Sequence, residues 1–337
     1  MKKYIAALNS RENLSEEEIQ EVMQMIMSGE AKRDDVTNFL LALRAKGPTV
    51  DEITGAAKIM RKFVVPIKSK HKNILDTCGT GGDRKDTFNI STTAALVLAG
   101  AGMVVAKHGN RSVSSRCGSA CILEALGVNL DVEEAHLSEC LDQVGIAFLF
   151  AQKLHPAMKN VAAIRKELGV ETIFNILGPL TNPASATHQV VGVYNRDLVE
   201  PICEVLKNLG LKKALVVHGA DGLDEITTTD KTFIAEILDG NIVTYDIDPE
   251  EVGIKRAHDK DLLGGELDVN VKIVNDILDG KLGPKRDIVV LNAAYALYAA
   301  EEVSSIEDGI VKAEESIDTG AARRKLEELK EFTHREF

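Results

Sequence analysis

Tryptophan is absent from this sequence of 337 residues, and aromatic residues make up only 4 % of it. Such a composition offers neither the base-stacking platform of a protein that binds single-stranded nucleic acid nor the aromatic belt of a membrane protein. No apolar run approaches the ~18 residues that a membrane-spanning helix needs. The first residues also lack the apolar stretch of a secretory signal. We therefore expect a cytoplasmic protein with no membrane partner.

Paired cysteines are also missing. The five cysteines are odd in number and include no C-x-x-C pair, which favours reduced thiols over a disulfide framework. Two of them are spaced by one helical turn, but no histidine follows at the spacing of a zinc site. The sequence thus predicts neither disulfides nor zinc. The cysteines are Cys78, Cys117, Cys121, Cys140 and Cys203.

Positive charge is scarce overall. The chain has 40 Lys and Arg residues against 52 Asp and Glu residues, a net charge of −12. Nucleic acid and anionic membranes attract a positive field, so neither is expected as a partner. A domain takes roughly 150 residues, so the length predicts two domains.

Residues 1–70 show helical patterns only. Ser15 and Thr49 each open an amphipathic segment with a capping box, in which a glutamate follows three positions later. Between them, Asp34 or Asp35 is expected to open a further helix. Three short helices without a strand predict a small helical domain or half of a dimer interface.

From residue 74 onward, short apolar runs alternate with helical patterns, which predicts an α/β fold around a mostly parallel sheet. Helices are expected between several of the strands, at 92–100, 132–144 and 198–210. The expected strands are 74–77, 103–108, 146–151, 189–194, 214–219 and 288–293.

Two helical segments, 156–168 and 172–180, follow each other without a strand between them. They can return to the N-terminal helices and make the small domain discontinuous. The expected domains are thus 1–70, joined by helices from about 156–184, and an α/β domain at 71–337.

A glycine-rich loop, Asp76-Thr77-Cys78-Gly79-Thr80-Gly81-Gly82-Asp83, directly follows the first expected strand. Its glycines let the backbone N–H groups turn toward a ligand, an arrangement that suits phosphate. It matches neither the dinucleotide-binding pattern, which would need glycine where Arg84 stands, nor the P-loop. Taken alone, the glycines are equally compatible with a plain tight turn.

A second anion site is expected a few residues later. The segment 89–93 leads into an Ala- and Leu-rich helix, with Ser91 or Thr92 as the natural N-cap. Free N–H groups at a helix N-terminus attract an anion, although the hydroxyls can also be simple caps.

Acidic residues are absent from the 37 residues between Thr87 and Leu123, where the chain average would place about six. The window carries Lys107, Arg111 and Arg116 instead, together with several serines. A solvated surface is the usual explanation of a charge cluster, but basic residues without counter-ions favour a polyphosphate site. Both this loop and the glycine loop follow strands, so the two can face the same edge of a parallel sheet.

Adjacent carboxylates, Asp224 and Glu225, come after the strand expected at 214–219. Mg²⁺ is commonly held by one or two carboxylates together with substrate phosphates. Such a pair is common on the surface of an acidic chain, but its place after a strand favours a metal site.

Together these motifs resemble the anthranilate phosphoribosyltransferases, which belong with the pyrimidine nucleoside phosphorylases to one glycosyltransferase family. After the segment GSA, this chain has Cys121 where the family usually has aspartate. The motifs occur in the family's order and are DTCGTGGD (76–83), FNIST (88–92), KHGNRSVSSRCGSA (107–120), LEALGV (123–128), NILGPLTNP (175–183) and GLDE (222–225).

The resemblance implies that anthranilate and phosphoribosyl pyrophosphate react to give N-(5-phosphoribosyl)anthranilate and pyrophosphate, with Mg²⁺ as cofactor, in tryptophan biosynthesis. It also implies a homodimer formed through the helical domain. A phosphorylase that uses free phosphate is a competing hypothesis, against which the KHGNRS segment and the carboxylate pair argue. A nucleic-acid-binding relative is disfavoured by the net charge.

The family's site residues carry over by position. Lys107 and Arg165 would be the catalytic residues; Ser91, Asp224 and Glu225 would hold Mg²⁺. Anthranilate would contact Gly79, Asn110 and Arg165, with His108, His155 and Pro179 along its access path. Phosphoribosyl pyrophosphate would contact Gly79, Gly82, Asp83, Thr87, Asn89, Ile90, Ser91, Thr92, Lys107, His108, Gly109, Asn110, Arg111, Ser112, Val113, Ser114, Ser115 and Ser119.

Overall fold

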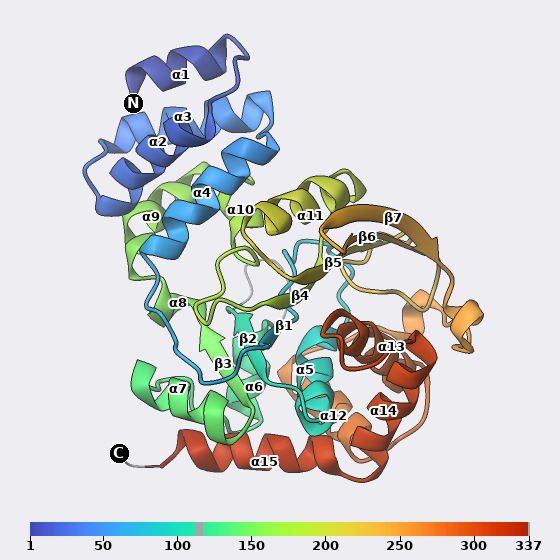
Figure 1. Ribbon diagram of the computed structural model, residues 1–337. Helices are drawn as coiled ribbons and strands as arrows, with labels where there is room; N and C mark the ends of the chain where they lie inside the picture. Colours follow the sequence, from blue (N-terminus) through green and yellow to red (C-terminus); the bar gives the residue numbers. More distant parts are fainter. Residues whose placement is uncertain (112–116, 336–337) are drawn as a thin grey trace.

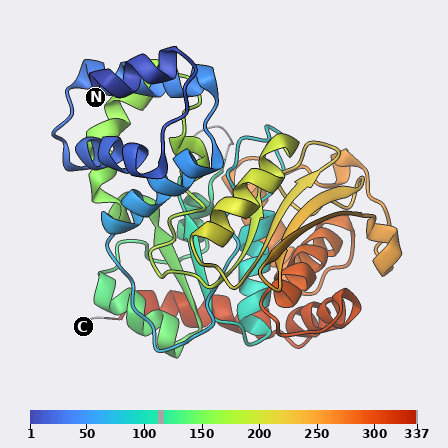
Figure 2. The same ribbon diagram turned by 45° about the horizontal axis from the view of Figure 1, so that its top comes forward.

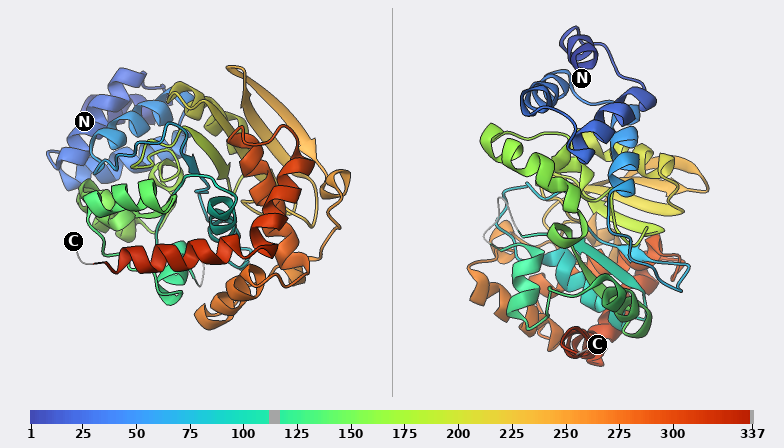
Figure 3. Two further views of the ribbon diagram at one scale, coloured as in Figure 1. Left: turned by 60° about the horizontal axis from the view of Figure 1, so that its bottom comes forward. Right: turned by 90° about the vertical axis from the view of Figure 1, so that its left-hand side faces the viewer.

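The computed structural model describes residues 1–111 and 117–335, which form a helical unit set against a larger α/β unit (Figure 1). The N-terminal helices and the last helix lie at opposite ends of the molecule (Figure 3). No helix in the described ranges is both long and apolar enough to cross a membrane.

Four helices open the chain: α1 (Lys2–Asn9), α2 (Glu16–Ser28), α3 (Arg33–Lys46) and α4 (Val50–Lys62). The capping boxes at Ser15 and Thr49 are confirmed. Neither Asp34 nor Asp35 opens α3: both lie in its first turn, after the N-cap Lys32. The helix α1 was not predicted, because its eight residues are too short to show a clear period.

The helical segments predicted at 156–168 and 172–180 form η1 (Pro156–Met158), α9 (Lys159–Leu168) and α10 (Phe174–Leu177). The helix α9 packs against α2 and α3, as Figure 2 shows. Val161 and Ile164 of α9 belong to the same apolar cluster as the buried residues of α2, α3 and α4. The proposed division of the chain into two domains stays a prediction.

Seven strands form one sheet in the order β3-β2-β1-β4-β5-β6-β7. Five of them are parallel, and all five were predicted; the last two are antiparallel and were not. The strands are β1 (Leu75–Asp76), β2 (Val105–Gly109), β3 (Ile146–Phe150), β4 (His188–Gly192), β5 (Lys213–Gly219), β6 (Thr232–Leu238) and β7 (Asn241–Ile247).

The strand predicted at 288–293 is wrong, because this segment lies within the helix α13 (Pro284–Ala299). Most of α13 from Ile288 onward is buried, so its sequence there is apolar on all sides, apart from Asn292. Periodicity does not distinguish such a run from a buried strand.

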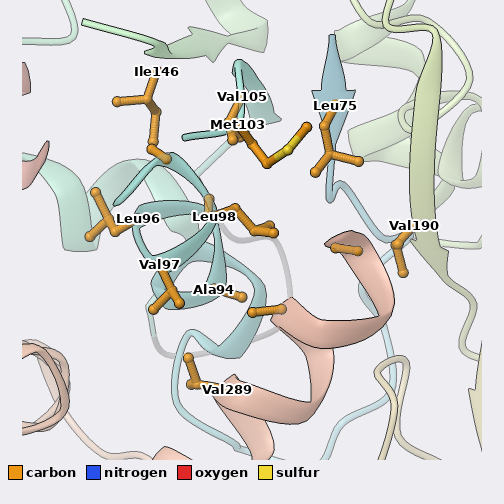
Figure 4. Packing of buried hydrophobic residues seen from close by; sticks show 14 of the residues in the cluster. Leu75, Ala94, Leu96, Val97, Leu98, Met103, Val105, Ile146, Val190 and Val289 are labelled. Atoms are coloured by element: carbon orange, nitrogen blue, oxygen red, sulfur yellow. The ribbon is translucent and has the colours of Figure 1, made fainter. Parts of the chain in front are cut away.

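One face of the sheet is covered by a cluster of helices whose centre is α5 (Ile90–Gly100). Ala94, Val97 and Leu98 of α5 pack near Leu75 of β1 and Val289 of α13 (Figure 4). This buried anchoring fixes α5 with its N-terminus at the sheet. The remaining helices are α6 (Ser119–Ala125), α7 (Glu134–Gln143), α8 (Ala151–Leu154), η2 (Arg196–Leu198), α11 (Val199–Asn208), η3 (Pro249–Val252), η4 (Asp259–Asp261), α12 (Leu267–Leu278), α14 (Ile306–Asp318) and α15 (Ala321–Thr333).

The chain reverses its direction across the sheet at β1. From β1 it adds β2 and β3 on one side, and it then returns to place β4 on the other side. Ligands of open α/β sheets bind beyond the carboxyl ends of the strands at such a reversal. The glycine loop after β1 therefore lies where a ligand is expected.

Candidate functional site

Hydrogen bonds hold the glycine loop against the end of β4. The N–H of Thr80 donates to the carbonyl of Gly192 (2.8 Å), and Thr80 Oγ1 accepts from the N–H of Tyr194 (3.2 Å). Gly81 and Gly82 have φ values of 64° and 92°, in the left-handed region that favours glycine. The loop thus keeps a conformation in which its backbone amides remain close to the sheet edge.

Gly192 and the acidic pair lie in direct backbone contact. A Cβ at Gly192 would overlap the main-chain carbonyl of Asp224, so only glycine fits. Gly79 is also close: a Cβ there would stand 3.3 Å from Asp224 Oδ2. The motif after β1 and the motif after β5, far apart in the sequence, thus form one site.

Replacing Gly192 by alanine is expected to lower the free energy of unfolding by about 3 kcal/mol, because the loop before Asp224 must move to admit the methyl group. Gly178→Ala is the matched control, since a Cβ there meets nothing within 4 Å and its φ is −51°. Urea unfolding of the two variants measures the difference. Equal stability of both would contradict the close contact.

The N-cap of α5 is Asn89, not Ser91 or Thr92 as predicted. The Asn89 side chain does not cap the helix and instead donates to the carbonyl of Cys117 (3.0 Å). The N–H of Ser91, in the first turn, donates to Glu225 Oε1 (3.2 Å). The helix start therefore attracts a negative group, as predicted, but in this structure the group belongs to the protein.

Lys107 is buried in the middle of β2, with 4 % of its surface exposed. Its ammonium donates to the carbonyl of Thr77 (2.8 Å) and to Ser91 Oγ (3.4 Å). No carboxylate lies within ion-pair distance of Lys107 in the part of the chain that the structure describes. The cation thus stands between the glycine loop and α5.

Three carboxylates, those of Asp83, Asp224 and Glu225, act on one another through their charges, and the charge of Lys107 acts on Glu225. Loss of hydration, together with the charges of Asp83 and Glu225, holds the pKa of Asp224 well above its usual value. Loss of hydration also raises the pKa of Glu225 to about 7, although Lys107 opposes this shift. Negative charge is thus concentrated at this edge of the sheet.

Two neutral histidines line the end of β2. His108 Nδ1 lies 3.1 Å from the carbonyl of Gly178, so this nitrogen carries the proton. The other nitrogen, Nε2, lies 3.1 Å from His155 Nε2 and accepts a hydrogen bond from it. Burial lowers the pKa of His108 to about 3 and that of His155 to about 4. These imidazoles are therefore uncharged at neutral pH.

A buried aspartate orders the same region. Asp76 accepts from the N–H of His108 (3.1 Å) and from Asn182 Nδ2 (2.8 Å). Asp76, Cys78 and His108 bring ligand atoms within 4.8 Å of one another. Because both imidazole nitrogens and the carboxylate already have hydrogen bonds, this group does not form an open metal site.

Arg165 lies on α9, in the helical unit. Its guanidinium donates to Asn175 Oδ1 (3.4 Å) and lies 5.5 Å from the ring of Phe174. Burial lowers the pKa of Arg165, and no carboxylate within the described residues forms an ion pair with it. A half-buried guanidinium with so few partners is suited to an incoming carboxylate.

The basic loop is described only in part. The prediction that Arg111 lacks a counter-ion is wrong: its guanidinium pairs with Glu124, just outside the acid-free window (2.6 Å). The carbonyl of Asn110 accepts from Ser119 Oγ (3.2 Å). The predicted ligands Ser112, Val113, Ser114 and Ser115, together with Arg116, lie outside the described residues.

Several site residues were not predicted from the sequence. Thr80, Gly192, Tyr194 and Asn175 support the loops by backbone and side-chain contacts. The signal for Gly192 was a glycine inside the strand expected at 189–194; in the structure it ends β4, beside the switch in strand order. No sequence pattern indicates the contacts of Tyr194 or Asn175.

The helical unit, the larger α/β unit and the loops suited to binding phosphate together define a class of transferase. The helical bundle domain of the glycosyl transferase family matches residues 2–64, and the a/b domain of the same family matches residues 71–323. The anthranilate phosphoribosyltransferase of Acetivibrio thermocellus is 52 % identical, over 99 % of this chain and 97 % of that protein.

Solved structures of similar proteins indicate the same family. The anthranilate phosphoribosyltransferase of Thermus thermophilus has a TM-score of 0.93 at 41 % identity, covering 98 % of this chain and 99 % of that one. The Saccharomyces cerevisiae enzyme in complex with PRPP and Mg has a TM-score of 0.91 at 29 % identity, covering 98 % and 97 %. The chain therefore belongs to the anthranilate phosphoribosyltransferases of the glycosyl transferase family.

Proposed function

We propose that this chain transfers the phosphoribosyl group of 5-phosphoribosyl 1-pyrophosphate to anthranilate, giving N-(5-phosphoribosyl)anthranilate and pyrophosphate in tryptophan biosynthesis. The observation that carries the proposal is the meeting of a glycine loop, a buried lysine and a carboxylate cluster at one sheet edge. Within the family, this supports the transferase over the phosphorylase, because free phosphate needs no metal-binding carboxylates.

The carboxylate cluster fits a divalent cation. The pKa of Asp224 is held well above its usual value and that of Glu225 is raised to about 7, and the charge of Lys107 opposes the shift of Glu225. Carboxylate and hydroxyl oxygens are the ligands that Mg²⁺ prefers. Asp224, Glu225 and Ser91 would hold the ion, which when bound neutralises charge on the pyrophosphate.

Phosphoribosyl pyrophosphate is proposed to bind the glycine loop and the start of α5. The leaving pyrophosphate takes the electron pair of the C1–O bond, and the ribose ring develops oxocarbenium character, as in glycoside transfer. Lys107 is placed to stabilise the departing negative charge. The described residues proposed to contact this substrate are Gly79, Gly82, Asp83, Thr87, Asn89, Ile90, Ser91, Thr92, Lys107, His108, Gly109, Asn110, Arg111 and Ser119.

Anthranilate is proposed to be held by Arg165, with Asn110 and Gly79 nearby. A guanidinium binds a carboxylate through two parallel hydrogen bonds, which fixes the orientation of the anthranilate amine. An aromatic amine is already neutral at pH 7, so its attack on C1 needs no strong general base. Orientation is therefore the main task of these residues.

The direct test is turnover by the purified protein. Anthranilate, phosphoribosyl pyrophosphate and Mg²⁺ should give a loss of anthranilate fluorescence, and the absence of tryptophan leaves a low protein background. A folded protein that leaves anthranilate unconsumed would refute the proposal. Replacing phosphoribosyl pyrophosphate by ribose 1-phosphate is the control for the phosphorylase alternative.

Mg²⁺ binding should weaken as the pH falls. The pKa of Glu225 is raised to about 7 and that of Asp224 is held well above its usual value, so protons compete with the ion for these carboxylates as the pH falls. Below pH 7 the apparent dissociation constant of Mg²⁺ should rise about tenfold per pH unit for each proton displaced. Calorimetric titration without substrate, which avoids ionisation of the phosphates, measures this.

An affinity that is constant between pH 8 and pH 6 would contradict the assignment of these carboxylates as ligands. Glu225→Gln is the matched variant, because the amide has the shape of the carboxylic acid but does not titrate. Its remaining Mg²⁺ affinity should depend less steeply on pH.

A cytoplasmic homodimer formed through the helical unit completes the proposal. Leu41 on α3 is 40 % exposed, and the acidic chain offers little attraction for polyanionic polymers. Sedimentation of the wild-type protein and of Leu41→Glu tests this: the wild type should be dimeric and the variant shifted toward monomer.

A further inference from the structure

The acidic pair lies in an irregular part of the chain. Asp224 and Glu225 belong to the connection 220–231, which joins β5 to β6. Backbone groups in such a connection lack the regular partners of a helix or a sheet, so other groups must supply hydrogen bonds wherever the chain is buried. The orientation of the two carboxylates therefore depends on what holds the main chain on either side of the pair.

The turn before the pair is held from within the same connection. Asp221 Oδ1 accepts from the N–H of Leu223 (3.0 Å), and the carbonyl of Leu223 accepts from the N–H of Gly219 (2.8 Å). Asp221 Oδ2 also accepts from Thr227 Oγ1 (2.7 Å). Because the Leu223 carbonyl belongs to the peptide group that leads into Asp224, these contacts fix how the chain enters the pair.

The main chain after the pair is held by a distant residue, Asn292 of α13. Asn292 Oδ1 accepts from the N–H of Ile226 (3.0 Å), and Asn292 Nδ2 donates to the carbonyl of Ile226 (2.8 Å). The same Nδ2 donates to the carbonyl of Ile288, one turn earlier in α13 (2.8 Å), which fixes the amide on its helix. The N–H of Ile226 belongs to the peptide group that follows Glu225. Asn292 thus fixes the plane of that peptide group, and with it the position from which the Glu225 side chain extends.

Burial distinguishes Asn292 from an amide on the surface. Asn292 is 5 % exposed and Ile226 is 0 % exposed. The other residues of 288–299 are apolar or tyrosine. Asparagine is a weaker helix former than leucine or alanine, and a buried amide is costly unless it is hydrogen-bonded, so helix formation and burial do not explain this residue. Because α13 packs against α5, β4 and β5 (Figure 1), the amide is attached to a firmly held element.

We propose that Asn292 is a positioning residue for the divalent-cation site, which orients the main chain after Glu225 so that the acidic pair presents its carboxylates to the ion. This inference rests on the proposed function. Glu225 Oε1 accepts from the N–H of Ser91 (3.2 Å), so its carboxylate lies at the start of α5, where Ser91 is a proposed ligand. Residues that orient metal ligands without touching the ion commonly contribute about 10- to 100-fold to metal affinity.

Asn292→Leu should weaken the binding of Mn²⁺ about tenfold, because leucine keeps the branched shape of the amide but loses both contacts with Ile226. Mn²⁺ prefers the same oxygen ligands as Mg²⁺, and the EPR signal of the free ion gives its dissociation constant without substrate. The binding that is lost in the double variant Asp224→Asn, Glu225→Gln defines the part that belongs to the site.

Steady-state kinetics provides a second measurement. In Asn292→Leu, the Mg²⁺ concentration that gives half of the maximal rate should rise by a similar factor. The kcat at saturating Mg²⁺ and the KM for anthranilate should stay close to the wild-type values, because Asn292 contacts neither substrate. A general loss of structure would instead lower kcat at every Mg²⁺ concentration.

Asn129→Leu is the matched control. Asn129 Oδ1 accepts from the N–H of Asp131 (2.9 Å), and Asn129 Nδ2 donates to the carbonyl of Thr333 at the end of α15 (3.1 Å). The control therefore makes the same chemical change and also removes an accepted and a donated main-chain hydrogen bond. Its affinity for Mn²⁺ should equal that of the wild type.

Asn292→Ala guards against a failure of the leucine variant to fold, since alanine is the strongest helix former and fits within the space of the amide. It should weaken Mn²⁺ binding in the same direction, and thermal unfolding identifies the folded samples. Wild-type affinity for Mn²⁺ in a folded Asn292 variant, or an equal loss in Asn129→Leu, would overturn the inference. Turnover of anthranilate by the wild type is measured on the same samples: its absence counts against the proposed function, whereas the Mn²⁺ dissociation constants decide the role of Asn292.

Discussion

Replacing both members of the acidic pair, Asp224→Asn together with Glu225→Gln, should lower Mg²⁺-dependent kcat/KM about 1000-fold. Groups that stabilise charge developing in a transition state are worth this much when they are preorganised in a water-poor site. The amides keep the size of the side chains, so the close contact between Gly192 and Asp224 is preserved. Initial rates over a range of Mg²⁺ concentrations measure the effect.

A matched control is Asp239→Asn with Glu200→Gln, which makes the same chemical changes at two exposed positions away from the site. Its kcat/KM should equal that of the wild type. If the site variant kept both its rate and its dependence on Mg²⁺, the pair would not be the metal site.

Arg165→Ala should raise the KM for anthranilate about 100-fold, because a charge-assisted bidentate contact contributes up to roughly 3 kcal/mol. The KM for phosphoribosyl pyrophosphate should change little, since Arg165 lies on α9 and the glycine loop follows β1. Steady-state kinetics with each substrate varied in turn separates the two constants.

Arg165→Lys is the informative companion, because it keeps the charge and loses the planar fork; its KM for anthranilate should fall between the wild type and Arg165→Ala. Lys166→Ala, at the exposed neighbouring position, is the control. A large rise in KM for phosphoribosyl pyrophosphate alone would reverse the assignment of Arg165.

Much of the α/β core could be predicted because its signals are local. The five parallel strands are short apolar runs that directly precede glycine or polar segments, and Ser15 and Thr49 cap their helices through residues three positions away. The failure at α13 has a physical cause: where burial surrounds an element, the pattern loses its period. The antiparallel strand β7 forms one edge of the sheet with β6 beside it, and the mixed composition of β7 gave no clear strand signal.

Some features of the site could also be predicted and others could not. The types of residue needed to bind phosphate and metal were evident from motifs, because glycine, lysine and paired carboxylates have few common functions after parallel strands. The ion-pair and hydrogen-bond partners of these residues were not evident from the sequence. Arg111 has its counter-ion in Glu124, and the anion at the start of α5 is Glu225, 134 positions further along the chain.

The sequence by itself determined the class of fold, the motifs of the site and the resemblance to a family, because these depend on the order and spacing of residue types. It also limited the partners through the absence of tryptophan, of long apolar runs and of net positive charge. Only the tertiary structure decided which groups neutralise one another. The raised pKa values of Asp224 and Glu225, the neutral state of His108 and the contact of Tyr194 with Thr80 arise from burial and proximity between segments distant in sequence.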